Sequence, residues 1–193
     1  KKLFRMISYF CQLNSGWIEN NYLKKLGEDS AKVFIDVNQC IKTLDAINID
    51  KNLLKRLNLL YVEDDDIIRI ELSQLLGGFF SNIYVAKDGK EGLRTYLENQ
   101  DHIDIILTDI NMPYLNGIEM IKKIRGINSK VPVIFATAHS DNEFLAEAIK
   151  LRVQEYIIKP IDVRRLLSLM SDIASILYQE FLLKQQQYEL TKY

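Results

Sequence analysis

The spacing of apolar and polar residues changes near residue 58. Before that point apolar residues recur at helical intervals, most regularly in the stripe Phe34, Val37, Ile41 and Leu44. After it, short apolar runs alternate with amphipathic segments five times. The pattern predicts a helical N-terminal extension over residues 1–57 and an α/β domain over residues 58–178.

The five apolar runs predict buried strands, each followed by a helix. The runs are residues 59–62, 83–86, 103–108, 131–136 and 156–158, and the helices are 67–76, 90–97, 118–124, 144–151 and a long one from Asp162. Such alternation is typical of a parallel sheet with helices on both faces. Right-handed crossovers then bring the carboxyl ends of all five strands to one edge.

The last predicted helix is longer than a sheet of this size requires. Residues 162–193 contain no Gly or Pro. Their stripe runs in steps of three and four through Leu167, Met170, Ala174, Leu177, Phe181, Lys184 and Tyr188. We expect the first half to pack on the sheet. Residues 179–193 extend it, either as a coiled-coil stalk that dimerises or leads to an output domain, or as a truncated tail.

Composition narrows the classes of protein. The 25 Lys and Arg against 26 Asp and Glu give a net charge of −1, which argues against direct nucleic-acid binding. Cys11 and Cys40 form no CxxC pair, so we do not expect a zinc site. Two isolated thiols are typical of a protein in the reducing cytoplasm. Uncharged stretches such as residues 6–18 are shorter than the roughly 20 apolar residues of a membrane span, so no span is expected.

Polar side chains suited to phosphate chemistry follow four of the five predicted strands. Glu63 and Asp64 follow the first, Asp109 the third, Thr137 the fourth and Lys159 the fifth. Open α/β sheets bind ligands at this edge. Clustered carboxylates suit Mg²⁺, and an Asp carboxylate can accept a phosphoryl group. The residues therefore predict Mg²⁺-assisted phosphoryl transfer, with the solitary Asp109 as the best acceptor.

Four stretches around these residues resemble the receiver domain of bacterial two-component response regulators. They read LLYVEDDDIIRIEL, IDIILTDINMPYLNG, VPVIFATA and YIIKPI, in the family's order and spacing. The resemblance covers about residues 58–178. It implies a flavodoxin-like, doubly wound sheet of strand order 2-1-3-4-5. It also implies a phosphorylation switch that catalyses only its own phosphorylation and dephosphorylation.

The resemblance assigns the acids their roles. Asp109 resembles the phosphoacceptor. A histidine kinase or a phosphotransfer protein would donate the phosphoryl group to it. Glu63 and Asp64 resemble the pair that positions Mg²⁺. The backbone carbonyl of Asn111, two residues after the acceptor, would be a further metal ligand.

The remaining site residues are assigned by the same resemblance. Thr137 and Lys159 would bind the phosphoryl group, and Tyr156 would be the aromatic residue that turns inward with it. Asn111 and His139 match the variable positions that tune the lifetime of the aspartyl phosphate. In this family the bond between the residues equivalent to Lys159 and Pro160 is often cis.

One position departs from the family's pattern. Arg152 stands where receivers often have Gly at the end of the fourth helix. A Gly there allows a left-handed cap, which an Arg adopts only at a cost, so the geometry of this loop is open.

Two other classes of function stay open. A phosphohydrolase of the haloacid dehalogenase type also uses an Asp nucleophile, but it needs a second Asp where this chain has Asn111. A receiver-shaped scaffold could bind partners without phosphorylation, although such a protein usually lacks one of the acids or the Lys. The sequence does not name the kinase, the signal or the output.

Overall fold

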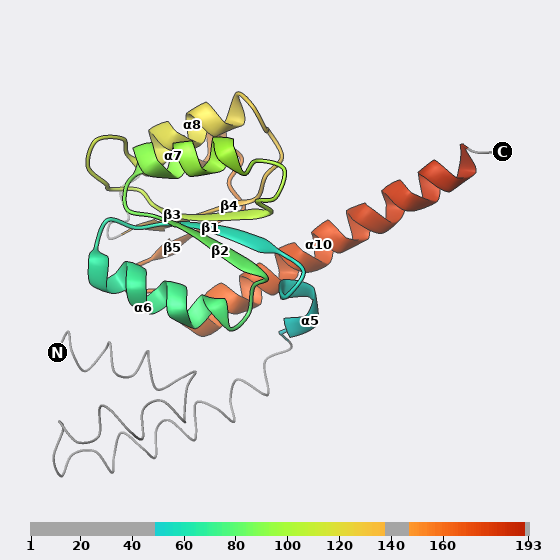
Figure 1. Ribbon diagram of the computed structural model, residues 1–193, viewed down its shortest axis with the longest axis horizontal. Coiled ribbons are helices and arrows are strands. Elements are labelled where there is room, and N and C mark those ends of the chain that lie inside the picture. The colour runs from blue at the N-terminus through green and yellow to red at the C-terminus, as the bar shows by residue number, and fades with distance from the viewer. Residues whose placement is uncertain (1–48, 138–146, 192–193) are drawn as a thin grey trace, which may run out of the picture. The chain divides into compact units, whose positions relative to one another are not determined.

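The computed structural model, drawn in Figure 1, describes residues 49–137 and 147–191. Five strands form one sheet: β1 (Asn58–Val62), β2 (Asn82–Ala86), β3 (Ile105–Asp109), β4 (Val133–Thr137) and β5 (Glu155–Ile158). All neighbours are parallel, in the order β2-β1-β3-β4-β5. The predicted flavodoxin-like topology is confirmed. The predicted helical stripe that begins at Phe34 lies outside the described residues.

Helices cover both faces of the sheet. Helices α7 (Gly89–Glu98) and α8 (Gly117–Arg125) lie on one face, and α6 (Asp66–Gly77) and α10 (Val163–Leu190) on the other (Figure 1). An Asp or Asn side chain caps the first turn of each helix by accepting backbone N–H groups. The four caps are Asp65, Asp88, Asn116 and Asp162. Residues 147–150 are also helical, within the predicted helix 144–151.

Two predicted strands begin too early in the sequence. The apolar runs that start at Ile103 and Val131 overlap β3 and β4, but each strand begins two residues later than its run and ends one residue beyond it. The Ile103 N–H donates to the Asn99 carbonyl in a turn, at 3.1 Å, and the Ile103 side chain is nevertheless buried. Burial in the core, rather than strand geometry, accounts for its apolar character.

Helix α10 has a buried half and an exposed half. Its buried residues are Val163, Leu166, Leu167, Met170, Ser171, Ile173 and Ala174. No residue of α10 beyond Ala174 is buried, and the C-terminal part of the helix runs past the end of the sheet (Figure 1). By length and composition alone, α10 is long and apolar enough to cross a membrane. The search for uncharged stretches in the sequence did not indicate such a helix. Core helices of soluble proteins have the same length and composition, and the first half of α10 is buried against the rest of the domain as a core helix is.

A short helix, α5 (Lys51–Leu54), packs on α10 within the compact unit Asp50–Tyr193. Leu54 is fully buried, and the Asp50 N–H donates to Ser171 Oγ at 2.9 Å. The Arg56 guanidinium lies 5.4 Å from the centre of the Tyr178 ring. Residues 50–57 thus contact a domain whose start the sequence pattern puts at residue 58.

The loop at Arg152 keeps the left-handed geometry. Arg152 has φ 52°, its N–H donates to Ile149 O at 3.1 Å, and the Val153 N–H donates to Ala148 O at 3.3 Å. These are the two hydrogen bonds of a Schellman cap. Arg125 supports the turn by donating from Nε to Leu151 O at 2.8 Å. The Arg therefore occupies a conformation that glycine adopts more readily.

Candidate functional site

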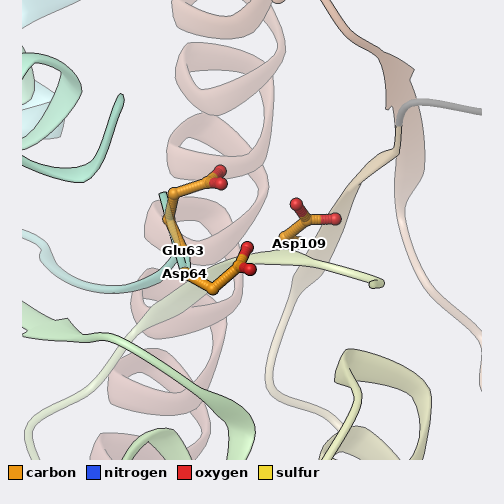
Figure 2. Close-up of side chains that lie close together, drawn as sticks. All are labelled: Glu63, Asp64 and Asp109. Carbon is orange, nitrogen blue, oxygen red and sulfur yellow. The ribbon is translucent and has the colours of Figure 1, made fainter. Parts of the chain in front are cut away.

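Three carboxylates converge at the carboxyl edge of the sheet. Glu63 and Asp64 directly follow β1, and Asp109 is the last residue of the neighbouring strand β3. One oxygen of each lies within 4.8 Å of the others. Figure 2 shows the three side chains turned toward the same point. The predicted convergence follows because β1 and β3 are adjacent and end at the same level.

Lys159 links two of these acids across the sheet. Its Nζ donates to Glu63 Oε1 at 2.8 Å, to Glu63 Oε2 at 2.7 Å and to Asp109 Oδ2 at 2.5 Å. Glu63 is 1% exposed and Asp109 6%. The lysine directly follows β5, and its bond to Pro160 is cis. One ammonium group therefore neutralises part of the charge of two buried carboxylates.

Burial and pairing act in opposite directions on the pKa values of this network. Burial raises the pKa of Glu63 above its ordinary 4.5, although Lys159 acts to lower it. Burial also lowers the pKa of Lys159, but hydrogen bonds to Asp109 and Glu63 outweigh it, so the net pKa lies above 10.5. Lys159 is therefore a cation at neutral pH. A single lysine beside three acids leaves an excess of negative charge, which suits a divalent cation.

The loop after β3 is packed closely behind Asp109. The Asn111 N–H donates to Asp109 Oδ1 at 3.0 Å, and the Asn111 side chain is exposed beside it. The Gly117 N–H donates to Ile110 O at 2.9 Å. A Cβ on Gly117 would lie 2.1 Å from the Asp109 carbonyl oxygen, so a larger residue would displace the end of β3.

Thr137 and Tyr156 share one face of the sheet. Thr137 is the last residue of β4 and is buried, and its carbonyl accepts the Lys159 N–H at 2.7 Å. The β4–β5 register pairs Phe135 with Tyr156 and Thr137 with Ile158. Since side chains alternate along a strand, Thr137 and Tyr156 lie on the same side, one diagonal step apart. Tyr156 is partly exposed, and the predicted tuning residue His139 lies outside the described residues.

One residue of the site had no role in the sequence interpretation. Arg69, on the second turn of α6, donates from Nη1 to Glu63 O at 2.9 Å and to Asp64 O at 3.3 Å. Its Nη2 also pairs with Asp66. The only signal in the sequence is an Arg three residues after an Asp, which is ordinary spacing for a pair on a helix surface.

Comparison with known families agrees with this geometry. The family described as "Response regulator receiver domain" matches residues 59–171, more than half of the chain. The chain belongs to the response regulator receiver family. The predicted relationship is confirmed.

Relatives of this receiver are regulatory proteins. Transcriptional regulatory protein ZraR of Escherichia coli K12 is 36% identical over 102 residues, which are 52% of this chain and 23% of ZraR. Transcriptional regulatory protein LytR of Staphylococcus aureus N315 is 38% identical over 109 residues, 55% of this chain and 43% of LytR. The chain thus matches less than half the length of either relative.

Solved structures share the receiver fold. The N-terminal domain of an uncharacterised Wolinella succinogenes protein is 35% identical, with a TM-score of 0.61, covering 64% of this chain and 98% of that one. CheY from Borrelia burgdorferi, solved with CheX, BeF₃ and Mg²⁺, is 26% identical with a TM-score of 0.57, covering 61% and 88%.

Proposed function

We propose that this receiver is a two-component phosphorylation switch in which Asp109 accepts the phosphoryl group. The observation that carries the proposal is the hydrogen-bonded group of Lys159, Glu63 and Asp109, with Asp64 at its open side. The donor would be a histidine kinase or a phosphotransfer protein, and the domain would act in the cytoplasm. Its task is regulatory: it would turn over no substrate other than its own phosphoryl group.

The donor set fits Mg²⁺. Three carboxylates with oxygens within 4.8 Å of one another provide the hard oxygen ligands that this ion prefers. Glu63, Asp64, Asp109 and the Asn111 carbonyl would hold it. When bound, the ion neutralises charge on the phosphoryl oxygens and on the acceptor.

Phosphoryl transfer would proceed by attack of an Asp109 carboxylate oxygen on phosphorus. The new oxygen–phosphorus bond forms as the bond from phosphorus to the donor breaks, and the leaving group keeps that electron pair. Lys159 is placed to hold a phosphoryl oxygen as a point charge, as it now holds Asp109 Oδ2. The Thr137 hydroxyl would donate a further hydrogen bond, and Asn111 and His139 would govern how fast water reaches the product.

The signal would spread through Thr137 and Tyr156. Phosphorylation adds about −1.5 to −2 charges to the site at neutral pH. Thr137 and Lys159 move toward that charge, and Tyr156, on the same sheet face as Thr137, turns into the space that is vacated. A shift from 1:99 to 99:1 between two states needs about 5.5 kcal/mol of differential interaction, which a few charge-assisted hydrogen bonds can supply.

The projecting half of α10 would transmit or stabilise the output. Phe181, Leu183, Tyr188 and Leu190 are exposed along it. A helical segment as short as residues 179–193 is only marginally stable in water without partners. A coiled coil with a second copy, or continuation into an output domain, would stabilise it. Sedimentation that gives a strict monomer, with and without phosphorylation, would contradict the homodimer.

Two rival functions predict different results. A scaffold would bind partners equally well after Asp109→Asn. A phosphohydrolase would turn over phosphate esters, which the exposed Asn111 two residues after the nucleophile does not favour.

Beryllofluoride, a stable mimic of the phosphoryl group, tests the proposal. We expect Mg²⁺ and beryllofluoride together to raise the free energy of unfolding beyond the gain that Mg²⁺ alone provides. At a hundred times the dissociation constant the gain is about 2.7 kcal/mol. Asp109→Asn abolishes this gain if the proposal is correct. An equal gain in the variant would contradict it.

A further inference from the structure

Arg69 turns back from helix α6 over the loop that carries the acids. Nη1 donates to the carbonyls of Glu63 and Asp64 at 2.9 and 3.3 Å, and Nη2 pairs with the Asp66 carboxylate. The side chain is only 15% exposed, unusual for an arginine on the first turns of a surface helix. It thus joins the loop and the start of α6 through one rigid group.

The loop needs such a constraint because of its charge. Residues 63–66 are four consecutive acids, and Asp109 faces two of them. Lys159 binds the carboxylates of Glu63 and Asp109. Asp65 is oriented by capping α6, where its Oδ1 accepts the N–H groups of Ile67 and Ile68 at 2.9 and 3.1 Å. Arg69 contributes what these contacts do not, which is a donor to the carbonyls of Glu63 and Asp64.

The chemistry of the side chain fits this task. A guanidinium has five N–H donors in a fixed plane and can bind a carboxylate and two carbonyls at once. A lysine carries the same charge on a flexible stem, without the fork. Since Arg69 binds carbonyls rather than the metal-facing carboxylates, metal binding does not displace it.

We propose that Arg69 is a positioning residue for the metal site: by clamping the carbonyls of Glu63 and Asp64 to Asp66, it holds the carboxylate of Asp64 toward Asp109. This inference rests on the proposed function, since it assigns a residue to the Mg²⁺ site. Groups that orient metal ligands from outside typically change metal affinity by 10- to 100-fold.

The effect of Arg69→Met on Mg²⁺ binding tests the proposal by its sign. Removing a cation beside a metal site would, by charge alone, make Mg²⁺ bind more tightly. Loss of positioning makes it bind more weakly. We expect the dissociation constant for Mg²⁺, measured by titration calorimetry on the full chain, to rise about 10-fold or more. Arg69→Lys, which keeps the charge but not the fork, should fall between this variant and the wild type.

Arg94→Met provides a matched control. Arg94 also pairs with an acid one helical turn away, Glu91, at 3.3 Å, on helix α7. Its removal should leave Mg²⁺ affinity unchanged. Unaltered or tighter Mg²⁺ binding by Arg69→Met, with or without a loss of stability in urea, would overturn the proposal, as would an equal loss in Arg94→Met. If Arg69→Met does not fold, Arg69→Lys decides by the same criterion.

The outcome is separable from that of the proposed function. Phosphorylation of the wild-type chain by acetyl phosphate tests whether the site accepts a phosphoryl group. Mg²⁺ titration of the variants tests what Arg69 does, and it gives an answer whether or not that phosphorylation occurs.

Discussion

Lys159 Nζ lies 2.5 Å from Asp109 Oδ2, and the same ammonium group also binds both carboxylate oxygens of Glu63. The lysine therefore binds two of the carboxylates that the proposed Mg²⁺ would also bind. A metal cation at this site would neutralise part of the negative charge that Lys159 now neutralises. This relationship makes the stability of the domain depend on which cation is present.

Lys159→Met should destabilise the receiver in the absence of Mg²⁺. Removing one partner of a buried ion pair leaves carboxylates without compensation, and we expect a loss of about 3 kcal/mol in urea unfolding. Millimolar Mg²⁺ should restore more stability to the variant than it adds to the wild type. Lys130→Met, at an exposed lysine, is the control. Equal effects of Mg²⁺ on variant and wild type would contradict the competition between lysine and metal.

Arg152→Gly should stabilise the domain. Arg152 has φ 52°, and a left-handed conformation costs an L-residue roughly 1–2 kcal/mol. Glycine adopts it freely but loses more backbone entropy on folding, so the expected net gain is about 0.5–1 kcal/mol. Arg152→Ala keeps the strained backbone and should not give this gain. A gain in both variants would show that the side chain, rather than the backbone angle, is unfavourable.

Residues 50–57 should contribute to the stability of the receiver. Leu54→Ala removes a fully buried side chain of α5 and should cost about 2–5 kcal/mol. A chain beginning at Asp50 should keep the urea midpoint that the unit Asp50–Tyr193 has within the full chain. A chain beginning at Asn58 should unfold at a lower urea concentration. Equal midpoints for the two truncations would mean that the predicted boundary at residue 58 is the energetic one.

Glu147 should make stability depend weakly on pH. Hydrogen bonds from Lys122 and Lys150 lower its pKa from 4.5 to about 2. Because the folded state binds this proton less readily, Glu147 adds stability above about pH 4.5 and loses the contribution as the pH falls toward 2. Glu147→Gln should therefore unfold at less urea than the wild type at pH 7, with a smaller difference at pH 3.5. Both lysine side chains are exposed, so 1 M salt should screen the ion pairs and also reduce the difference between variant and wild type. A difference that is constant with pH would contradict this account.

Much of the fold and the convergence of the acids follow from the sequence. The buried strands β1, β3 and β4 read as continuous apolar runs, and parallel connections bring their carboxyl ends together. That rule alone predicted that Glu63, Asp64 and Asp109 would meet. It needed no knowledge of side-chain conformation.

Other features depend on contacts that a linear pattern does not contain. The four residues of α5 are too few to show a helical period, so the docking of Leu54 on the domain had no signal. The choice of Lys159 between several acids depends on three-dimensional distances. Arg69 resembles any helix-surface arginine until the loop carbonyls beneath it are seen. The left-handed Arg152 was an open question because the sequence there has no glycine.

The central claim is that Asp109 is the phosphoacceptor, and intact mass spectrometry tests it most directly. The wild-type chain and Asp109→Asn are incubated with acetyl phosphate, with and without Mg²⁺. We predict one added phosphoryl group on the wild type with Mg²⁺, and none on the variant or without the metal. An added phosphoryl group on Asp109→Asn, or none on a wild-type chain that binds Mg²⁺ and fails to bind beryllofluoride, would contradict the claim.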